Sequence, residues 1–109
     1  MPIDFAKAFK ALKNGIVDLA EKDLKDYIAA ATKDGNDILN AMKDDLKRWT
    51  KLLASGDLTK NDFTDLVLGQ KDNLELVALK QAGLAEIAAD QFKSDLFDLI
   101  TNTIIGLIP

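Results

Sequence analysis

The clearest helix stop and start in the chain lie within Ser55-Gly56-Asp57-Leu58-Thr59-Lys60-Asn61-Asp62. Gly56 stands where a glycine commonly ends a helix, because glycine adopts the left-handed conformation at a helix C-terminus without steric cost. Thr59 and Asp62 have the spacing of a capping box, in which each side chain accepts a hydrogen bond from the other residue's backbone N–H. The stretch therefore predicts a turn, followed by a short helix over residues 59–69.

Before this turn, apolar residues recur every three or four positions, which is the spacing of a helix with one buried face. The pattern predicts helices over residues 4–33 and 37–55. We place a turn between them at Lys33-Asp34-Gly35-Asn36-Asp37, because Gly, Asn and Asp are common at helix ends. The apolar row also runs through Gly35, so a single helix over residues 4–55 stays an alternative. That helix would be ~78 Å long at 1.5 Å per residue, and a compact chain of 11.9 kDa favours the turn.

After the short helix, the apolar row continues in phase and predicts a third long helix over residues 72–106. Only Gln81 stands where an apolar residue is expected, and the weak points of this helix are Gly83 and Gly106. A glycine inside a helix, such as Gly15 in the first one, predicts close packing against a neighbour. The chain is thus predicted to be all-α: one domain over residues 1–109, folded as an antiparallel helical bundle with three long helices and one short helix.

The composition excludes most of the catalytic and metal chemistry that proteins use. The chain has no Cys and no His, which removes disulfides, thiol nucleophiles, imidazole bases and the nitrogen and sulfur ligands of zinc. The acidic clusters at residues 34–37 and 57–62 lack the Gly and Glu positions of a calcium loop, and turn formation explains both clusters. We therefore predict a protein that is not an enzyme and has no cofactor and no metal site. A carboxylate enzyme stays an alternative hypothesis, although no carboxylate pair is distinguished by its setting.

The charge balance bears on the partners that the chain can bind. The 18 acidic and 14 basic residues give an acidic protein with a net charge of −4, which disfavours nucleic acid. The most apolar run, residues 96–109, is shorter than the ~20 apolar residues of a membrane span, so no transmembrane span is expected. The sequence begins without an export signal, and we expect a cytoplasmic protein on that basis.

The best candidates for an interaction surface are the Trp and the apolar residues of the C-terminal helix. Trp is enriched at binding hot spots. In the C-terminal run, apolar residues extend around the helix beyond the row that one neighbouring helix covers. This run is the centre of an intramolecular bundle, a self-association surface or a lipid contact, and the three interpretations stay open. The candidate interaction residues are Trp49, Phe97, Ile100, Ile104, Ile105 and Ile108.

For function, we predict a noncatalytic helical interaction or assembly module that self-associates through its C-terminal helix. The expected partner is a second copy, as a homodimer, or another protein. The alternative is an amphipathic bundle that binds lipid, a membrane surface or another apolar ligand. This alternative is weaker because membrane-surface helices usually carry Lys or Arg, and none follows Lys93. The sequence resembles helical bundles only as a class, which by itself specifies no function.

Overall fold

The structure, a computed structural model, describes residues 4–108 and is helical with no strand in that range. It confirms the predicted all-α bundle with three long helices and one shorter helix, and it adds a single-turn helix, α4, between α3 and α5. Residues 1–3 and Pro109, which the predicted domain includes, lie outside the described range. The elements are α1 (Phe5–Asp23), η1 (Lys25–Tyr27), α2 (Ile28–Ser55), α3 (Lys60–Gly69), η2 (Lys71–Asn73), α4 (Val77–Gln81) and α5 (Glu86–Gly106), where η marks a 3-10 turn.

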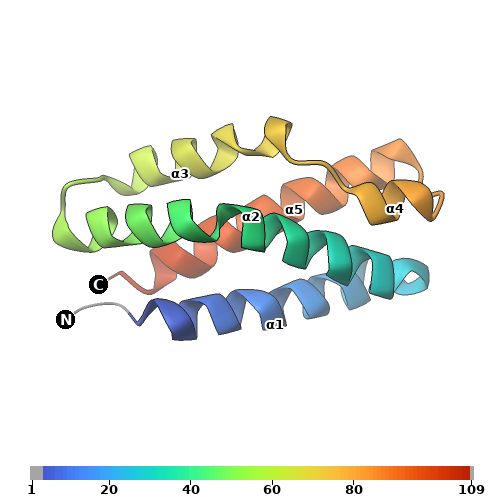
Figure 1. Ribbon diagram of the computed structural model, residues 1–109, viewed down its shortest axis with the longest axis horizontal. Coiled ribbons are helices and arrows are strands. Elements are labelled where there is room, and N and C mark those ends of the chain that lie inside the picture. The colour runs from blue at the N-terminus through green and yellow to red at the C-terminus, as the bar shows by residue number, and fades with distance from the viewer. Residues whose placement is uncertain (1–3, 109) are drawn as a thin grey trace.

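The four main helices run in alternating directions along the molecule, which measures 43 × 24 × 19 Å (Figure 1). The helix α1 packs against α2, and α5 packs against both α1 and α3, so the bundle closes on itself. The single turn α4 packs on α2 at the end of the bundle where α1 turns into α2. Both ends of the described chain lie at the opposite end of the bundle.

One core runs through the bundle, and all five helices contribute to it. Because each fully buried aliphatic or aromatic side chain is worth ~1.5–3 kcal/mol, this core accounts for much of the drive to fold. The largest fully buried side chains are those of Phe63, Phe92, Phe97, Leu12, Ile16, Leu39, Met42, Leu46, Leu79, Leu96, Ile100 and Ile104.

The turn predicted after Ser55 is confirmed. Gly56 adopts the left-handed conformation with φ 85°, and α3 follows with Thr59 as its N-cap. The backbone N–H of Asp62 donates to Thr59 Oγ1 over 3.0 Å, and the backbone N–H of Thr59 donates to Asp62 Oδ2 over 3.4 Å. Two of the N–H groups that have no partner within α3 are satisfied in this way, which fixes where the helix begins.

The turn predicted at residues 33–37 is wrong. The break between the first two helices comes earlier, at Leu24, whose φ of −136° and ψ of 61° are not helical. The helix α2 then continues without interruption through Gly35. A Cβ atom on Gly35 would lie 2.5 Å from Cγ2 of Ile16 on α1, so the glycine serves the close approach of two helices. The close neighbour expected at Gly15 is confirmed: it is Leu99 of α5, at 3.0 Å from a Cβ placed there.

The single helix predicted over residues 72–106 is also wrong, because the chain turns twice within that range. Leu74 is extended, with φ −117° and ψ 129°, and α4 begins only after it. Gln81 is the last residue of α4. Gly83 follows with φ 89°, a left-handed backbone conformation that residues other than glycine rarely adopt. The turn at Gly83 lets α5 start in a new direction, so α4 and α5 form a corner.

Candidate functional site

The structure places most of the predicted interaction residues within the chain's own core. Phe97, Ile100 and Ile104 on α5 are fully buried, and Trp49 on α2 is 6% exposed. The rows of apolar residues that widen the face of α5 are covered because this helix packs against α1 and α3 and also against α4. The four side chains therefore contact neighbouring helices of the same chain.

The end of α5 keeps a small apolar surface. Ile105 and Ile108 are half-buried and pack against the core, and Leu107 between them is 45% exposed. These residues form the exposed apolar surface of the C-terminal helix at this end of the bundle.

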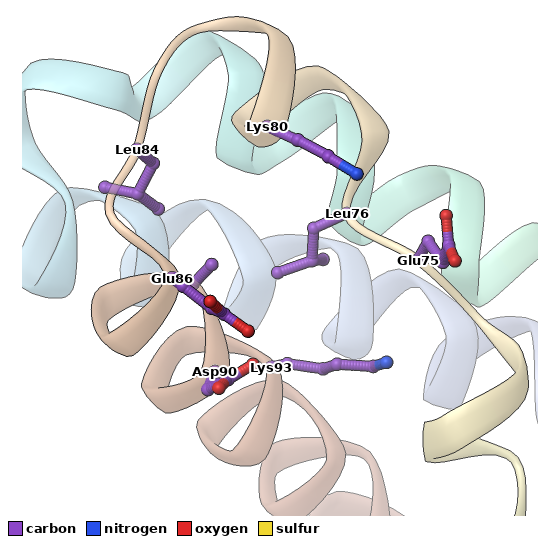
Figure 2. A pocket seen from close by; sticks show the side chains of 8 residues that line it. Glu75, Leu76, Lys80, Leu84, Glu86, Asp90 and Lys93 are labelled. Carbon is purple, nitrogen blue, oxygen red and sulfur yellow. The ribbon is translucent and has the colours of Figure 1, made fainter.

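At the opposite end, a groove of about 500 Å³ lies at the corner between α4 and α5. Its floor is apolar and its rim is charged, as in many protein interfaces. Figure 2 shows Lys80 of α4 and Lys93 of α5 on opposite walls, with Leu76 between them. We call this site the corner groove; its lining residues are Glu75, Leu76, Lys80, Leu84, Glu86, Ala89, Asp90 and Lys93.

The charged side chains on the rim of the corner groove form no ion pair within the described chain. Residues 4–108 contain two ion pairs, Lys33 with Asp37 and Arg48 with Asp45, and both lie on α2. Two lysines and three carboxylates therefore stand around one groove without an ion pair, as do most charged side chains of residues 4–108. Unmatched charges of both signs around an apolar floor suit a partner whose own charges complement them.

Two exposed apolar residues each follow a residue that lines the corner groove: Val77 follows Leu76, and Ile87 follows Glu86. Ile87, in the first turn of α5, is 85% exposed, and Val77, the first residue of α4, is 54% exposed. They are the most exposed large apolar side chains in the described part of the chain. Neither side chain is part of the lining of the groove.

The buried carboxylate of Asp34 holds this corner in place. Asp34 lies on α2 and is 2% exposed, and its two oxygens accept hydrogen bonds from the backbone N–H groups of Ala78, at 2.8 Å, and Leu79, at 2.7 Å. An isolated helix of five residues is unstable in water, so α4 depends on such tertiary contacts. Asp34 thus anchors the helix that forms one wall of the corner groove.

Neither the corner groove nor the role of Asp34 is evident from the sequence. Asp34 belongs to the stretch that predicts a turn at residues 33–37, and nothing local indicates that its carboxylate binds the backbone of a helix more than forty positions away. For the corner, Gln81 and Gly83 were the available signals, since both interrupt the helical pattern at the point where the chain turns.

A second, smaller hollow between the end of α1 and α5 contains the carboxyl groups of Asp23 and Asp95. The hydrogen bond between the two carboxyl groups raises the pKa of Asp23 above its usual 3.8, and burial and the charge of Asp95 raise it further. Lys22 acts in the opposite direction. The pair is a local source of repulsion when both groups are ionised.

This pair makes the stability of the chain depend on pH. Because the pKa of Asp23 is higher in the folded chain than in the unfolded chain, its contribution favours folding at low pH and is lost as the pH rises through the folded pKa. We expect Asp23→Asn to be more stable than the parent at pH 7, with a gain that shrinks as the pH falls through the raised pKa of Asp23 and is lost below about 3.8. Urea unfolding at both pH values measures this. Asp18→Asn, an exposed carboxylate on the same helix, is the charge-matched control, and an equal effect of the two variants would contradict the assignment.

The comparisons with known proteins identify no relative. No family model matches the sequence, and neither a characterised protein nor a solved structure shows significant similarity to it. In the described range, no group of three or more metal-ligating side chains comes together. None of the helices built from residues 4–108 combines the length and the apolar character needed to span a membrane.

Proposed function

We propose that the chain is a noncatalytic helical interaction module that docks a protein partner on the corner groove. The observation that carries this proposal is the groove itself, with apolar residues in its floor and two lysines and three carboxylates around its rim. Interfaces of this kind gain affinity from apolar groups buried at the centre and gain specificity from matched charges at the rim.

Docking through the C-terminal helix is the second candidate. Leu107 is 45% exposed and the flanking Ile105 and Ile108 are half-buried, which supports a smaller contact there. The two surfaces lie at opposite ends of the bundle, so variants at one end leave the other intact (Figure 1).

The size of the native complex tests this function. In extracts of the source cells, we expect the chain to migrate as a particle well above its own 11.9 kDa. Reversing two rim charges, Lys80→Glu with Lys93→Glu, should reduce that size, because the new carboxylates would repel the partner groups that the two lysines attract.

The matched control reverses two exposed lysines on α2, Lys47→Glu with Lys51→Glu, which are not part of the groove. It changes the net charge equally and should leave the native complex unchanged. A chain that migrates as a monomer in the extract, or equal effects of the two double variants, would contradict docking on the corner groove. Flotation of the chain with liposomes would instead support the lipid alternative.

A further inference from the structure

We propose that the chain binds an anionic membrane surface through a basic face that α1 and α2 form together, in the half of the bundle away from the corner groove. The contact is peripheral, since it uses side chains on the surface of the folded bundle. It does not rest on the docking of a protein at the corner groove. The basic face is defined by five exposed lysines: Lys10, Lys13, Lys43, Lys47 and Lys51.

The fold concentrates positive charge in this half of the bundle. Residues 4–14 and 43–55, at the start of α1 and the end of α2, contain seven of the 14 basic residues but three of the 18 acidic residues. The two segments are far apart in the sequence, and the antiparallel packing of α1 against α2 brings them side by side (Figure 1). The folded chain therefore has a positively charged region although its net charge is −4.

Helical spacing gathers the five lysines into two rows. Lys43, Lys47 and Lys51 are four residues apart along α2, so they lie one above the other on the same side of that helix. Lys10 and Lys13 are three residues apart on α1, which likewise places them on one side.

The two rows meet at the seam between α1 and α2. The ammonium groups of Lys13 and Lys43, one from each helix, lie 5.2 Å and 5.1 Å from the centre of the Phe9 ring. The face of an aromatic ring attracts a cation, which favours both ammonium groups at the seam. From there Lys10 and Lys47 continue toward the same end of the bundle, because the two helices run in opposite directions (Figure 1).

The charge of the basic face is not balanced within the chain. None of its five lysines forms an ion pair within residues 4–108. Two carboxylates stand beside the α2 row in the sequence: Asp45 is paired with Arg48 over 2.9 Å, and Asp44 alone is left against the lysines. Lysines four residues apart on a helix repel one another and destabilise it slightly. An anionic surface that covers the row would remove this repulsion.

The residue types of the basic face favour a membrane over a nucleic acid. Nucleic-acid recognition relies on the guanidinium fork of arginine, and the one arginine of the chain, Arg48, is paired with Asp45. Clusters of about four to eight lysines or arginines are typical of surfaces that bind anionic lipids. Mobile lipid headgroups can gather beneath flexible lysines without a matching shape. The C-terminal helix has no Lys or Arg after Lys93, and α1 and α2 supply the cations that it lacks.

Co-sedimentation of the purified chain with vesicles tests the proposal. At ~0.1 M salt, we expect binding to phosphatidylcholine vesicles that contain about one-third phosphatidylserine, and not to vesicles of phosphatidylcholine alone. Binding should be lost at ~1 M salt, where exposed charges are screened over ~3 Å. Failure to bind the anionic vesicles would overturn the proposal. Equal binding to both kinds of vesicle would also overturn it, because the contact would then depend on apolar side chains.

Charge reversal on the two helices locates the contact. Lys10→Glu with Lys47→Glu should weaken binding to the anionic vesicles roughly a hundredfold or more, since each lysine near such a surface contributes roughly fivefold and each reversal adds repulsion. The circular dichroism of this variant should match the parent, because both side chains are exposed.

The matched control is Lys80→Glu with Lys93→Glu, which changes the net charge equally but lies at the corner groove. It should bind the anionic vesicles as the parent does. Equal effects of the two double variants would show that net charge alone governs binding, and would overturn the basic face as the site.

Backbone amide shifts on addition of lipid bicelles of the same anionic composition map the contact. The shifts should centre on residues 10–13 and 43–51. Shifts centred on residues 105–108 would place the lipid contact on the C-terminal helix and overturn the basic face. Binding of poly-glutamate by a chain that ignores the anionic vesicles would assign the face to an acidic protein and overturn the membrane.

The outcomes separate this proposal from the proposed function. A chain that ignores anionic vesicles, while its native complex still depends on Lys80 and Lys93, would overturn the membrane contact and retain a protein at the corner groove. A chain that binds anionic vesicles through the basic face but migrates as a monomer in the cell extract would overturn the corner groove alone.

Discussion

Ile104→Asp is expected to unfold the chain. Ile104 is fully buried near the end of α5, so its side chain has no access to solvent. The variant loses ~1.5–3 kcal/mol of apolar burial and also places a carboxylate in the core, where an unpaired charge costs several kcal/mol more. Since domains of this size are stable by only ~5–15 kcal/mol, we expect loss of the helical circular dichroism signal at room temperature or a strongly lowered Tm.

Ile108→Asp is the control for this prediction. Ile108 lies beyond the end of α5 and is half-buried, so the new carboxylate can reach water. We expect this variant to stay folded and to lose about 1 kcal/mol or less. If Ile104→Asp remained folded and instead dissociated an oligomer, Ile104 would be buried between chains and not within one.

Asp34→Asn is expected to produce the second large effect. The carboxylate accepts two backbone hydrogen bonds on α4, and an asparagine has only one oxygen to accept them, so one buried N–H loses its partner. A hydrogen bond to a charged group contributes ~1.5–3 kcal/mol, so we expect the free energy of unfolding to fall by about 2–3 kcal/mol. The amide hydrogens of Ala78 and Leu79 should exchange much faster, since α4 has lost its anchor.

Asp37→Asn provides a matched control on the same helix. Asp37 is 60% exposed and pairs with Lys33 over 2.8 Å at the surface, where such a pair contributes ~0.2–1 kcal/mol. We expect a small change in stability and no change in the exchange of the α4 amides. Equal effects of the two variants, with Ala78 and Leu79 still protected, would show that Asp34 does not anchor α4.

The sequence predicts the fold class because local signals and the apolar rows agree over most of the chain. The turn at Gly56 and the capping box of Thr59 and Asp62 lie where expected, since their hydrogen bonds join residues close in sequence. The turn at residues 33–37 fails for the opposite reason. Gly35 and its neighbour Asp34 have the residue types of a turn, but they serve contacts with other helices that no local pattern reveals.

The candidate site is less predictable than the fold. A row of apolar residues on α5 shows that the helix has a wide buried face, but it does not show whether the neighbours belong to the same chain. The corner groove combines residues before α4, on α4, on α5 and in the loop between them, and it exists because the chain turns at Gly83. In one unbroken helix over residues 72–106, Leu84 and Lys93 would lie on opposite sides of the helix axis, and no groove would join them.

Contact of this chain with a second copy, at the corner groove or at the end of α5, is tested most directly by following its backbone amide resonances by nuclear magnetic resonance during dilution. A dimer formed at the corner should shift the amides of Glu86, Ile87 and Asp90 with concentration, along with others that line the groove, while residues 105–108 stay unchanged. Shifts confined to residues 105–108 would place self-association on the C-terminal helix instead. No concentration-dependent shift at either end would contradict self-association at the corner groove.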